Sequence, residues 1–284
     1  MKDVHLAPIV WIILLITCLS NPSEAATPGL PFTEDFSNAD LRDDALTDAN
    51  WSVEEQAVYL AWAESRQRPR YSATGTDVGS ETDNTRNVVL GDVDGDGDLD
   101  LIAGNDGQTN KLYLNEGSGG FAATGIDVGS ETDNTFSAVL GDVDGDGDLD
   151  LIAGNRFQTN KLYLNDGSGG FVFGGNVGSD TDATYSVVLG DVDGDGDLDL
   201  IAGNYNQTNK LYVNDGSGGF AATGTDVGSD TDGTYSVVLG DVDGDGDLDL
   251  IAGNWGQTNK LYLNDGSGGF AATGTNVGSE TDDT

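Results

Sequence analysis

Apolar residues in most of this chain stand in short runs that are separated by clusters of Gly, Asn, Asp and Ser. One such stretch contains the runs SVVLG at 236–240, LDLIA at 248–252 and KLYL at 260–263, and a further run, FAAT, occupies 270–273. Each run has the length of a β-strand and is bounded by turn-forming residues. No stretch here has the period of about 3.6 residues that marks an amphipathic helix. The pattern therefore predicts an all-β unit of four short strands, with the fourth beginning at Phe270.

This unit repeats along the chain. The block GDVDGDGDLDLIAGN occurs four times, and its copies begin at Gly91, Gly141, Gly190 and Gly240. Four strands in a period of about 50 residues are the signature of a β-propeller blade. A β-helix solenoid is the alternative, but its coils usually have a shorter period, roughly 20 residues. We therefore predict an all-β fold, a β-propeller of four-stranded blades, with four blade units visible.

The sequence ends part of the way through a repeat. A phrase resembling VGSETDNT precedes each Asp-rich block and occurs once more than the block does. Its copies begin at Val78, Val128, Val177, Val227 and Val277. Thr284 therefore falls just before the place where another first strand should begin. We expect an incomplete ring with more blades beyond Thr284, and an open arc would leave an unpaired sheet face that favours association.

The balance of charges is strongly acidic, with 50 Asp and Glu against 11 Lys and Arg and a formal net charge of -39. Nucleic-acid binding needs a basic surface, so this class of function is excluded. An acidic composition alone can indicate disorder. Here the acids recur at fixed positions, and this regularity favours the binding of cations.

The N-terminal residues resemble a secretion signal, which we place at 1–25. An apolar run spans Leu6–Leu19, and Ser23–Ala25 fits a small-x-small cleavage site. The run is shorter than the ~20 residues that a spanning helix needs, which disfavours the alternative of an uncleaved membrane anchor. A lipoprotein anchored at Cys18 is a further alternative, but Thr17 fits poorly before it. We expect a secreted or cell-surface protein without a membrane span after cleavage.

Cleavage would also limit the chemistry of the mature chain, which consists of a non-repeat segment at 26–70 and the repeats at 71–284. Cys18, His5 and Met1 are the single residues of their types, and all three lie inside the leader. The mature chain would therefore have no disulfide, no thiolate or imidazole zinc site and no His-based triad. Its stability would depend on core burial, on metal, or on both.

The Asp-rich block carries the candidate chemistry. The first copy reads DVDGDGDLD, with carboxylates at every second position. Ca²⁺ takes about six to eight oxygen ligands from carboxylates and carbonyls in a flexible loop. Asp92, Asp94 and Asp96 can converge on one ion, because alternate positions of a tight turn can point the same way. Gly95 and Gly97 permit that turn.

The remaining positions of the loop complete this hypothesis. Asp98 would give its backbone carbonyl, and Asp100, at the next strand, would close the coordination sphere. A helix-loop-helix calcium site is disfavoured, because Ala103 stands where that site needs a bidentate Glu. Turn formation alone is the other alternative, but it does not need five carboxylates that repel one another. Mg²⁺ prefers rigid octahedral sites, so Ca²⁺ is the predicted ion.

The motif DxDxDGxxD followed by LIAGN, once per four-strand unit, resembles the FG-GAP/VCBS repeats and the calcium-loaded blades of integrin α-subunit propellers. The resemblance covers residues 71–284. LIAGN stands where the family name has Gly-Ala-Pro, and the absence of the cysteines common in animal receptors favours a bacterial-type exported protein. The resemblance implies about one Ca²⁺ per repeat. The implied ligands are Asp92, Asp94, Asp96, Asp98 and Asp100; Asp142, Asp144, Asp146, Asp148 and Asp150; Asp191, Asp193, Asp195, Asp197 and Asp199; and Asp241, Asp243, Asp245, Asp247 and Asp249.

A few positions differ between the otherwise similar repeats. They are Arg86, Phe136, Tyr185 and Tyr235 before the first strand, and Asp106-Gly107, Arg156-Phe157, Tyr205-Asn206 and Trp255-Gly256 after AGN. Variation on a constant scaffold is typical of recognition loops, and Arg with aromatic residues suits a glycan or a cell-surface protein. Neutral drift and aromatic packing between blades are the alternatives. The Lys that follows each QTN is interpreted as a surface partner of nearby Asp.

These features favour an exported calcium-binding repeat protein that acts as a binding or adhesion module. A structural spacer of a larger secreted protein is one alternative. An accessory part of a polysaccharide-degrading enzyme is another, since paired carboxylates can perform acid–base catalysis. Every distinctive acid is, however, already assigned to a metal loop, so we predict no catalytic residue in this chain.

Overall fold

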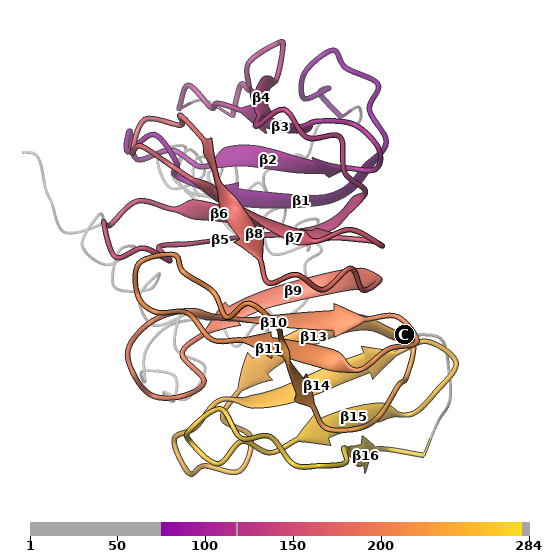
Figure 1. Cartoon of the computed structure of the whole chain (residues 1–284). Helices are drawn as coiled ribbons and strands as arrows, with labels where there is room; N and C mark the ends of the chain where they lie inside the picture. The colour runs from indigo at the N-terminus through magenta and orange to yellow at the C-terminus, as the bar shows by residue number, and fades with distance from the viewer. Residues whose placement is uncertain (1–74, 118, 280–284) are drawn as a thin grey trace, which may run out of the picture. The chain divides into compact units, whose positions relative to one another are not determined.

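The computed structural model describes residues 75–117 and 119–279. The predicted leader at 1–25, the non-repeat segment at 26–70 and the boundary between residues 70 and 71 lie outside these ranges. The described residues form β-strands and no helices. The strands are arranged as four separate four-stranded sheets (Figure 1). The described residues contain no helix that is long and apolar enough to cross a membrane. The predicted all-β class and four-stranded units are confirmed.

The strands recur with nearly constant bounds. The first sheet contains β1 (Thr85–Gly91), β2 (Asp100–Asn105), β3 (Asn110–Tyr113) and β4 (Ile126–Val128). The second contains β5 (Thr135–Gly141), β6 (Asp150–Asn155), β7 (Asn160–Leu164) and β8 (Val172–Val177). The third contains β9 (Thr184–Gly190), β10 (Asp199–Asn204), β11 (Asn209–Tyr212) and β12 (Thr225–Val227). The fourth contains β13 (Thr234–Gly240), β14 (Asp249–Asn254), β15 (Asn259–Tyr262) and β16 (Thr275–Val277).

Each sheet is an antiparallel meander in which every strand pairs with its neighbours in the chain. In the first sheet Val89 pairs with Ile102, and Ile102 pairs with Leu112. Because residues opposite one another in a ladder share a face, these three apolar side chains form one row. Leu101 and Ala103 alternate with Ile102 and lie on the other face. Both faces of the sheet are thus apolar, which explains why the strands read as continuous apolar runs.

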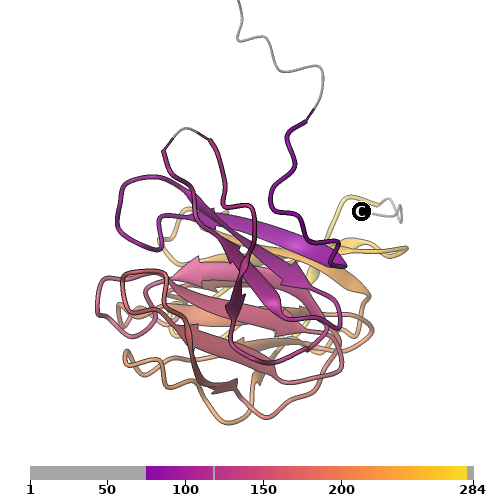
Figure 2. The same ribbon diagram turned by 90° about the horizontal axis from the view of Figure 1, so that it is seen from above.

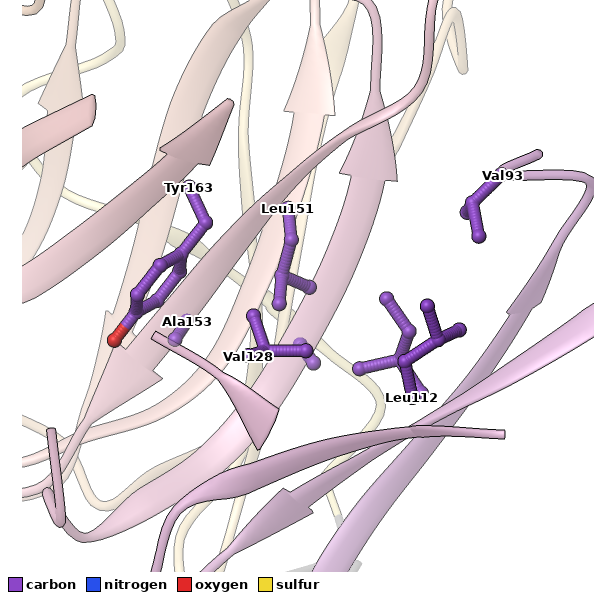
Figure 3. Close-up of a cluster of buried hydrophobic side chains, with 8 residues drawn as sticks. Val93, Leu112, Val128, Leu151, Ala153 and Tyr163 are labelled. Carbon is purple, nitrogen blue, oxygen red and sulfur yellow. The ribbon is translucent and has the colours of Figure 1, made fainter. Parts of the chain in front are cut away.

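The sheets pack face to face in chain order. Leu112 and Val128 of the first sheet and Val93 of its Asp-rich loop belong to one buried cluster with Leu151 and Tyr163 of the second sheet (Figure 3). Equivalent clusters join the second sheet to the third and the third to the fourth. Every cluster therefore draws one half from each of two successive sheets, so a single sheet cannot bury its own core. This is the packing of propeller blades.

The first strands of the sheets lie next to one another. Contacts join β1 to β5, β5 to β9 and β9 to β13, and Figure 2 shows the sheets from above. No contact of similar extent joins β1 to β13 in the described part of the chain. The four blades therefore form an open series there, and the expectation of further blades remains a prediction.

The fourth strand begins later than the sequence predicts. Phe270 forms an isolated bridge with Asn264 and packs on the core, and the chain then bends before β16 starts at Thr275. A Cβ built at Gly274 would lie 2.8 Å from Lys260 Cβ and 2.8 Å from the ring of Tyr262. This close approach sets the start of the strand after Gly274. The predicted start at Phe270 is therefore wrong, because the apolar run serves the core rather than the ladder.

Candidate metal centres

The Asp-rich loop connects the first strand of each sheet to the second. In the first copy it leaves β1 at Gly91 and enters β2 at Asp100. Gly95 and Gly97 have φ angles of 75° and 94°, and the equivalent glycines of the other three loops also have positive φ. Side chains with a Cβ are disfavoured in this region. The two glycines therefore let the chain turn back on itself, as the sequence predicts.

The turn brings carboxylates together in all four blades. One oxygen from each of three aspartates lies within 4.8 Å of the other two. The clusters are Asp92, Asp94 and Asp96; Asp142, Asp144 and Asp146; Asp191, Asp193 and Asp199; and Asp241, Asp243 and Asp245. Two oxygens that share a Ca²⁺ at about 2.3–2.6 Å are separated by no more than roughly 5 Å. The clusters have the donor atoms and the spacing to hold such an ion.

Backbone hydrogen bonds hold the carboxylates of the loop in place. The two oxygens of Asp92 accept from Gly95 N at 2.9 Å and from Gly97 N at 3.0 Å. Asp96 accepts from Asp98 N at 2.9 Å. The same pattern occurs in the other three loops. The loop is thus organised by its own amides, and the carboxylate lone pairs that these amides do not use remain for a cation.

The ninth position of the loop has a different role from the first three acids. Asp100 is fully buried, and its two carboxylate oxygens accept from Val93 N at 3.1 Å and Asn115 N at 2.8 Å. Asp100, at the start of β2, therefore ties the Asp-rich loop to the turn that follows β3. In the third loop the equivalent residue, Asp199, also joins the carboxylate cluster. Its predicted place in the coordination sphere stays a prediction.

The seventh position lies against the turn that follows the third strand. A Cβ built at Gly117 would clash with the Asp98 carboxylate, and the same relation holds for Asp148 with Gly167. Among the described residues, the Asp98 side chain does not belong to the carboxylate cluster. The predicted ligand at this position is the backbone carbonyl of Asp98. The position of the Asp98 side chain does not test that prediction.

Partial desolvation and like charges inside the loop make ionisation of its carboxyl groups unfavourable. The pKa of Asp94 is raised above its ordinary value, first because the loop partly desolvates the carboxyl and then because neighbouring aspartates carry the same charge. The pKa is raised for the same two kinds of reason at Asp144, Asp193 and Asp243. A bound cation would reverse this effect, since an opposite charge favours the ionised carboxylate.

A second loop, which joins the third strand of each sheet to the fourth, lies beside the Asp-rich loop. The NDGSGGF loop of each following blade packs on the Asp-rich loop of the blade before it. Asn165 Nδ2 and Gly169 N both donate to the Val93 carbonyl, at 2.8 and 3.0 Å. The same pair of bonds reaches Val143 and Val192 from the next two blades. The recurrence of this motif, as NEGSGGF in the first copy and NDGSGGF in the other three, was the available signal, but the blade that it contacts is apparent only from the structure.

The one Lys of each unit pairs with an Asp, as interpreted from the sequence. Lys111 and Lys210 lie 2.5 and 2.6 Å from Asp127 and Asp226. Lys161 and Lys260 make looser pairs with Asp133 and Asp230. The Asp members of the first two pairs are exposed, so each pair contributes little to stability.

The positions that vary between repeats gather into one surface, which we call the aromatic strip. It consists of Arg86, Phe136, Arg156, Phe157, Tyr185, Tyr205, Tyr235 and Trp255. Ring centroids lie 4.9 Å apart for Phe136 and Tyr185 and 4.8 Å apart for Tyr185 and Tyr235. Since these rings come from the starts of β5, β9 and β13, aromatic packing between blades is present. Phe157, Tyr235 and Trp255 nevertheless remain 60%, 38% and 45% exposed.

Arginine stands at one end of the strip. The Arg156 guanidinium lies 4.8 Å from the Phe157 ring centroid and 5.5 Å from that of Phe136. Its Nε is buried and has no hydrogen-bond partner among the described residues. Arg86 lies 5.1 Å from the Phe136 centroid and pairs with Asp106 at 2.6 Å. The strip therefore combines exposed aromatic faces with one unused donor.

Four-stranded sheets packed face to face, each with an Asp-rich loop between its first two strands, define a β-propeller repeat protein. The sequence model of the family described as FG-GAP-like repeat matches residues 92–153, 142–202 and 191–252, which together span more than half of the chain. The chain therefore belongs to the FG-GAP-like repeat family. The resemblance noted from the sequence is confirmed.

Comparison with other proteins adds the following findings. No curated protein matches the chain significantly. Among solved structures, the WD40 β-propeller domain of Doa1 is similar with a TM-score of 0.48 and 13% identity, over 69% of this chain and 56% of that one. BBS1N, in a crystal structure with ARL6DN soaked with mercury, is similar with a TM-score of 0.45 and 12% identity, over 72% of this chain and 56% of that one. The chain thus spans little more than half the length of these structures.

Proposed function

We propose that this protein is an exported, calcium-loaded β-propeller module that binds a ligand outside the cell. The observation that carries the proposal is the convergence of three carboxylates at the same place in each of the four blades. The leader-like pattern of residues 1–25 supports export. Extracellular calcium modules often bind at about 10⁻⁴–10⁻³ M, which suits this setting.

The chemistry of the loop favours Ca²⁺ as the ion. The donors are all oxygens, and the loop is built on glycines with positive φ that allow its shape to adjust. Ca²⁺ accepts such flexible sites with a high number of oxygen ligands, whereas Mg²⁺ demands a near-ideal octahedron and retains its waters. The aspartates at the first, third and fifth positions of the loop would hold the ion in most blades, and its charge would offset their mutual repulsion.

In this proposal the role of the ion is to stabilise the fold. The Asp-rich loop of one blade contacts the NDGSGGF loop of the next through the bonds to the Val93, Val143 and Val192 carbonyls. A cation that fixes the shape of the first loop would therefore also stabilise the contact between two blades. Metal that binds the native state and not the unfolded chain stabilises folding by mass action.

Calorimetric titration of the calcium-free protein tests the metal assignment. The expected result is uptake of about one Ca²⁺ per loop. A variant with Asn at Asp94, Asp144, Asp193 and Asp243 should lose this uptake. Asp166→Asn is the matched control, because Asp166 is an acid of the NDGSGGF turn and belongs to none of the clusters. Uptake equal in all three proteins, or in none of them, would refute the proposal.

The aromatic strip is our proposed ligand surface, with a glycan as the ligand. Aromatic faces stack on the apolar faces of sugar rings, and the partly exposed side chain of Arg156 carries guanidinium donors that suit a sugar oxygen. The strong net negative charge of -39 favours a neutral glycan over an acidic one. The exposed rings favour this binding role over a spacer, for which no such surface is needed.

A glycan array screened with the calcium-loaded protein tests the ligand. We expect binding of neutral glycans that is lost in Trp255→Ala and Tyr235→Ala. Binding that survives both substitutions would place the ligand elsewhere. Binding of a cell-surface protein with no glycan signal would refute the ligand class while leaving the metal assignment intact.

A further inference from the structure

The last strand of the second sheet differs from the last strands of the other three sheets. β8 has six residues, whereas β4, β12 and β16 have three each (Figure 1). The second repeat reads FVFGGNV at 171–177, where the first reads FAATGIDV at 121–128. Because the second repeat is one residue shorter here, its strand continues through the place where the other three repeats bend.

Two large apolar side chains occupy this extra length of strand. Val172 and Phe173 are 63% and 48% exposed. The first and third sheets pack on the two faces of the second sheet in the described structure. The two side chains are therefore exposed although their sheet has a neighbour on each side. The other repeats have small residues at these two positions, namely Ala122-Ala123, Ala221-Ala222 and Ala271-Ala272.

Residues of the neighbouring strand β7 hold Phe173 in position. The ring centroids of Phe173 and Tyr163 lie 6.1 Å apart in an edge contact, and the Lys161 ammonium lies 5.2 Å from the Phe173 centroid. Tyr163 is the cross-strand partner of Phe173, and Leu164 is the partner of Val172. Since successive residues of a strand point to opposite faces, each face of this edge carries one exposed apolar side chain beside an apolar or aromatic partner. A side chain that is already fixed loses less entropy when it binds a partner.

The backbone of β8 forms one edge of its sheet. Among the described residues no strand pairs with the outer side of β8. Edge strands are usually protected by short length or by charge, and β4 and β12 have three residues each, with Asp127 and Asp226 at their centres. β8 is longer and contains no charged residue. It has a bulge at Gly174, which lies C-terminal to Val172 and Phe173.

We propose that the outer edge of β8 binds an extended, basic segment of a partner protein, which adds a fifth strand to the second sheet. Strand addition takes its affinity from main-chain hydrogen bonds and its specificity from side-chain contacts. Val172 and Phe173 lie on opposite faces, so the segment needs two successive apolar residues to contact both. Lys or Arg on either side of this pair suits the loops that precede and follow β8, which contain Asp166 and Asp180.

The charge of the molecule favours this partner over a second copy of the same chain. The formal net charge of -39 makes two copies repel one another and attracts a basic segment. The β8 edge is also separate from the aromatic strip, which lies on and beside the first two strands of its sheets, whereas β8 is a last strand. The inference is therefore independent of both the glycan proposal and the metal assignment.

Selection from a displayed library of random linear peptides, with the full chain in millimolar calcium as the target, tests this proposal. We expect enrichment of peptides with two successive apolar residues between Lys or Arg. A variant with Val172→Ala and Phe173→Ala should bind synthetic copies of these peptides roughly tenfold or more weakly, as for the loss of interface anchors. It carries the residues of the other repeats, so its circular dichroism should be unchanged. Ile126→Thr is the matched control, because it removes an exposed apolar side chain from β4 and should leave peptide binding unchanged.

Two further measurements separate strand addition from other kinds of contact. An enriched peptide is made with every second amide N-methylated, in each of the two possible phases. One of these peptides should lose binding, because a strand turns alternate amides toward its neighbour. Retention of binding by both would overturn the proposal, and so would a library without enrichment or peptides that bind the alanine variant equally well. Light scattering tests the other occupant: a dimer formed by the natural protein and not by the alanine variant would assign the edge to a second copy and overturn the proposal.

Discussion

Single residues within the Asp-rich loop divide into two groups that the sequence pattern does not separate. Asp92, Asp94 and Asp96 gather their oxygens at one point, while the buried Asp100 uses both of its oxygens on backbone amides. A carboxylate that accepts two N–H bonds inside a sheet is a structural acid, whatever ion stands beside it. Alternation along the sequence predicts convergence of the acids, but it does not predict which of them the ladder requires.

This division predicts different consequences for two substitutions in one loop. Asp94→Asn should reduce calcium binding and leave the free energy of unfolding of the calcium-free protein unchanged or slightly higher, because it removes like-charge repulsion. Asp100→Ala should destabilise the protein with or without calcium by about 1–3 kcal/mol for each of two unsatisfied buried amides. Urea denaturation in EDTA and in calcium measures both. Equal behaviour of the two variants would contradict the division.

The acids of the NDGSGGF turns respond to pH in a predictable direction. Hydrogen bonds from the Ser168 hydroxyl, and then from the Ser168 and Gly170 amides, lower the pKa of Asp166 below its ordinary value of 3.8. Asp215 and Asp265 are lowered for the same reason. A lowered pKa in the folded state stabilises the protein above pH ~3.8, and this stabilisation is lost as the pH falls below that value.

We therefore expect the urea midpoint of the natural protein to fall between pH 5 and pH 3 more steeply than that of a variant with Asn at Asp166, Asp215 and Asp265. The difference between the two proteins should be constant above pH ~5, where both the folded and unfolded carboxyls are ionised. Two curves that run parallel down to pH 3 would rule out a role for these three acids in acid unfolding.

At the scale of the strand and loop, most of the fold was predictable and its exceptions have physical reasons. The first three strands of the unit at 234–262 agree with the apolar runs that predicted them to within a few residues. The fourth starts after Gly274 because Phe270 packs between sheets. A periodic pattern reports which residues are apolar, and it does not report whether a residue serves the ladder or the core.

The contact between successive blades was the part of the site that the sequence could not reveal. Asn165 donates to a carbonyl 72 residues earlier in the chain, so no local pattern indicates the pair. Only the packing of one sheet on the next brings the two loops together. Both motifs recur once per repeat in the sequence, but this recurrence does not indicate that they are partners.

The contact between blades predicts different losses of stability for substitutions at two equivalent asparagines. Asn214→Ala should destabilise the protein by about 1–3 kcal/mol, because the buried bond to the Val143 carbonyl and the partly buried bond to the Leu198 carbonyl are both lost. Asn115→Ala is the control: its side chain is less buried and donates only within its own blade, so its cost should be under half as large. Chemical denaturation of the two variants and the natural protein measures both. Equal losses would show that the contact between blades adds nothing.

At the scale of the whole molecule, the described part of the chain is a series of four nearly identical sheets whose stability depends on the interfaces between them. Each buried cluster is shared by two sheets, so a blade gains its core only from its neighbours. Each interface also contains an Asp-rich loop on one side. The described structure thus places concentrated negative charge at the same points where the blades must hold together, so the cation that we propose for each loop would offset this charge at the interfaces.

Thermal unfolding with and without calcium tests that claim most directly. We expect the Tm of the protein to fall sharply in EDTA and to recover when Ca²⁺ is added in excess, with a smaller recovery for Mg²⁺ at the same concentration. The ion would be acting on four loops at once, so the shift should be large for a protein of this size. A melting curve that is the same in EDTA and in millimolar calcium would contradict the account.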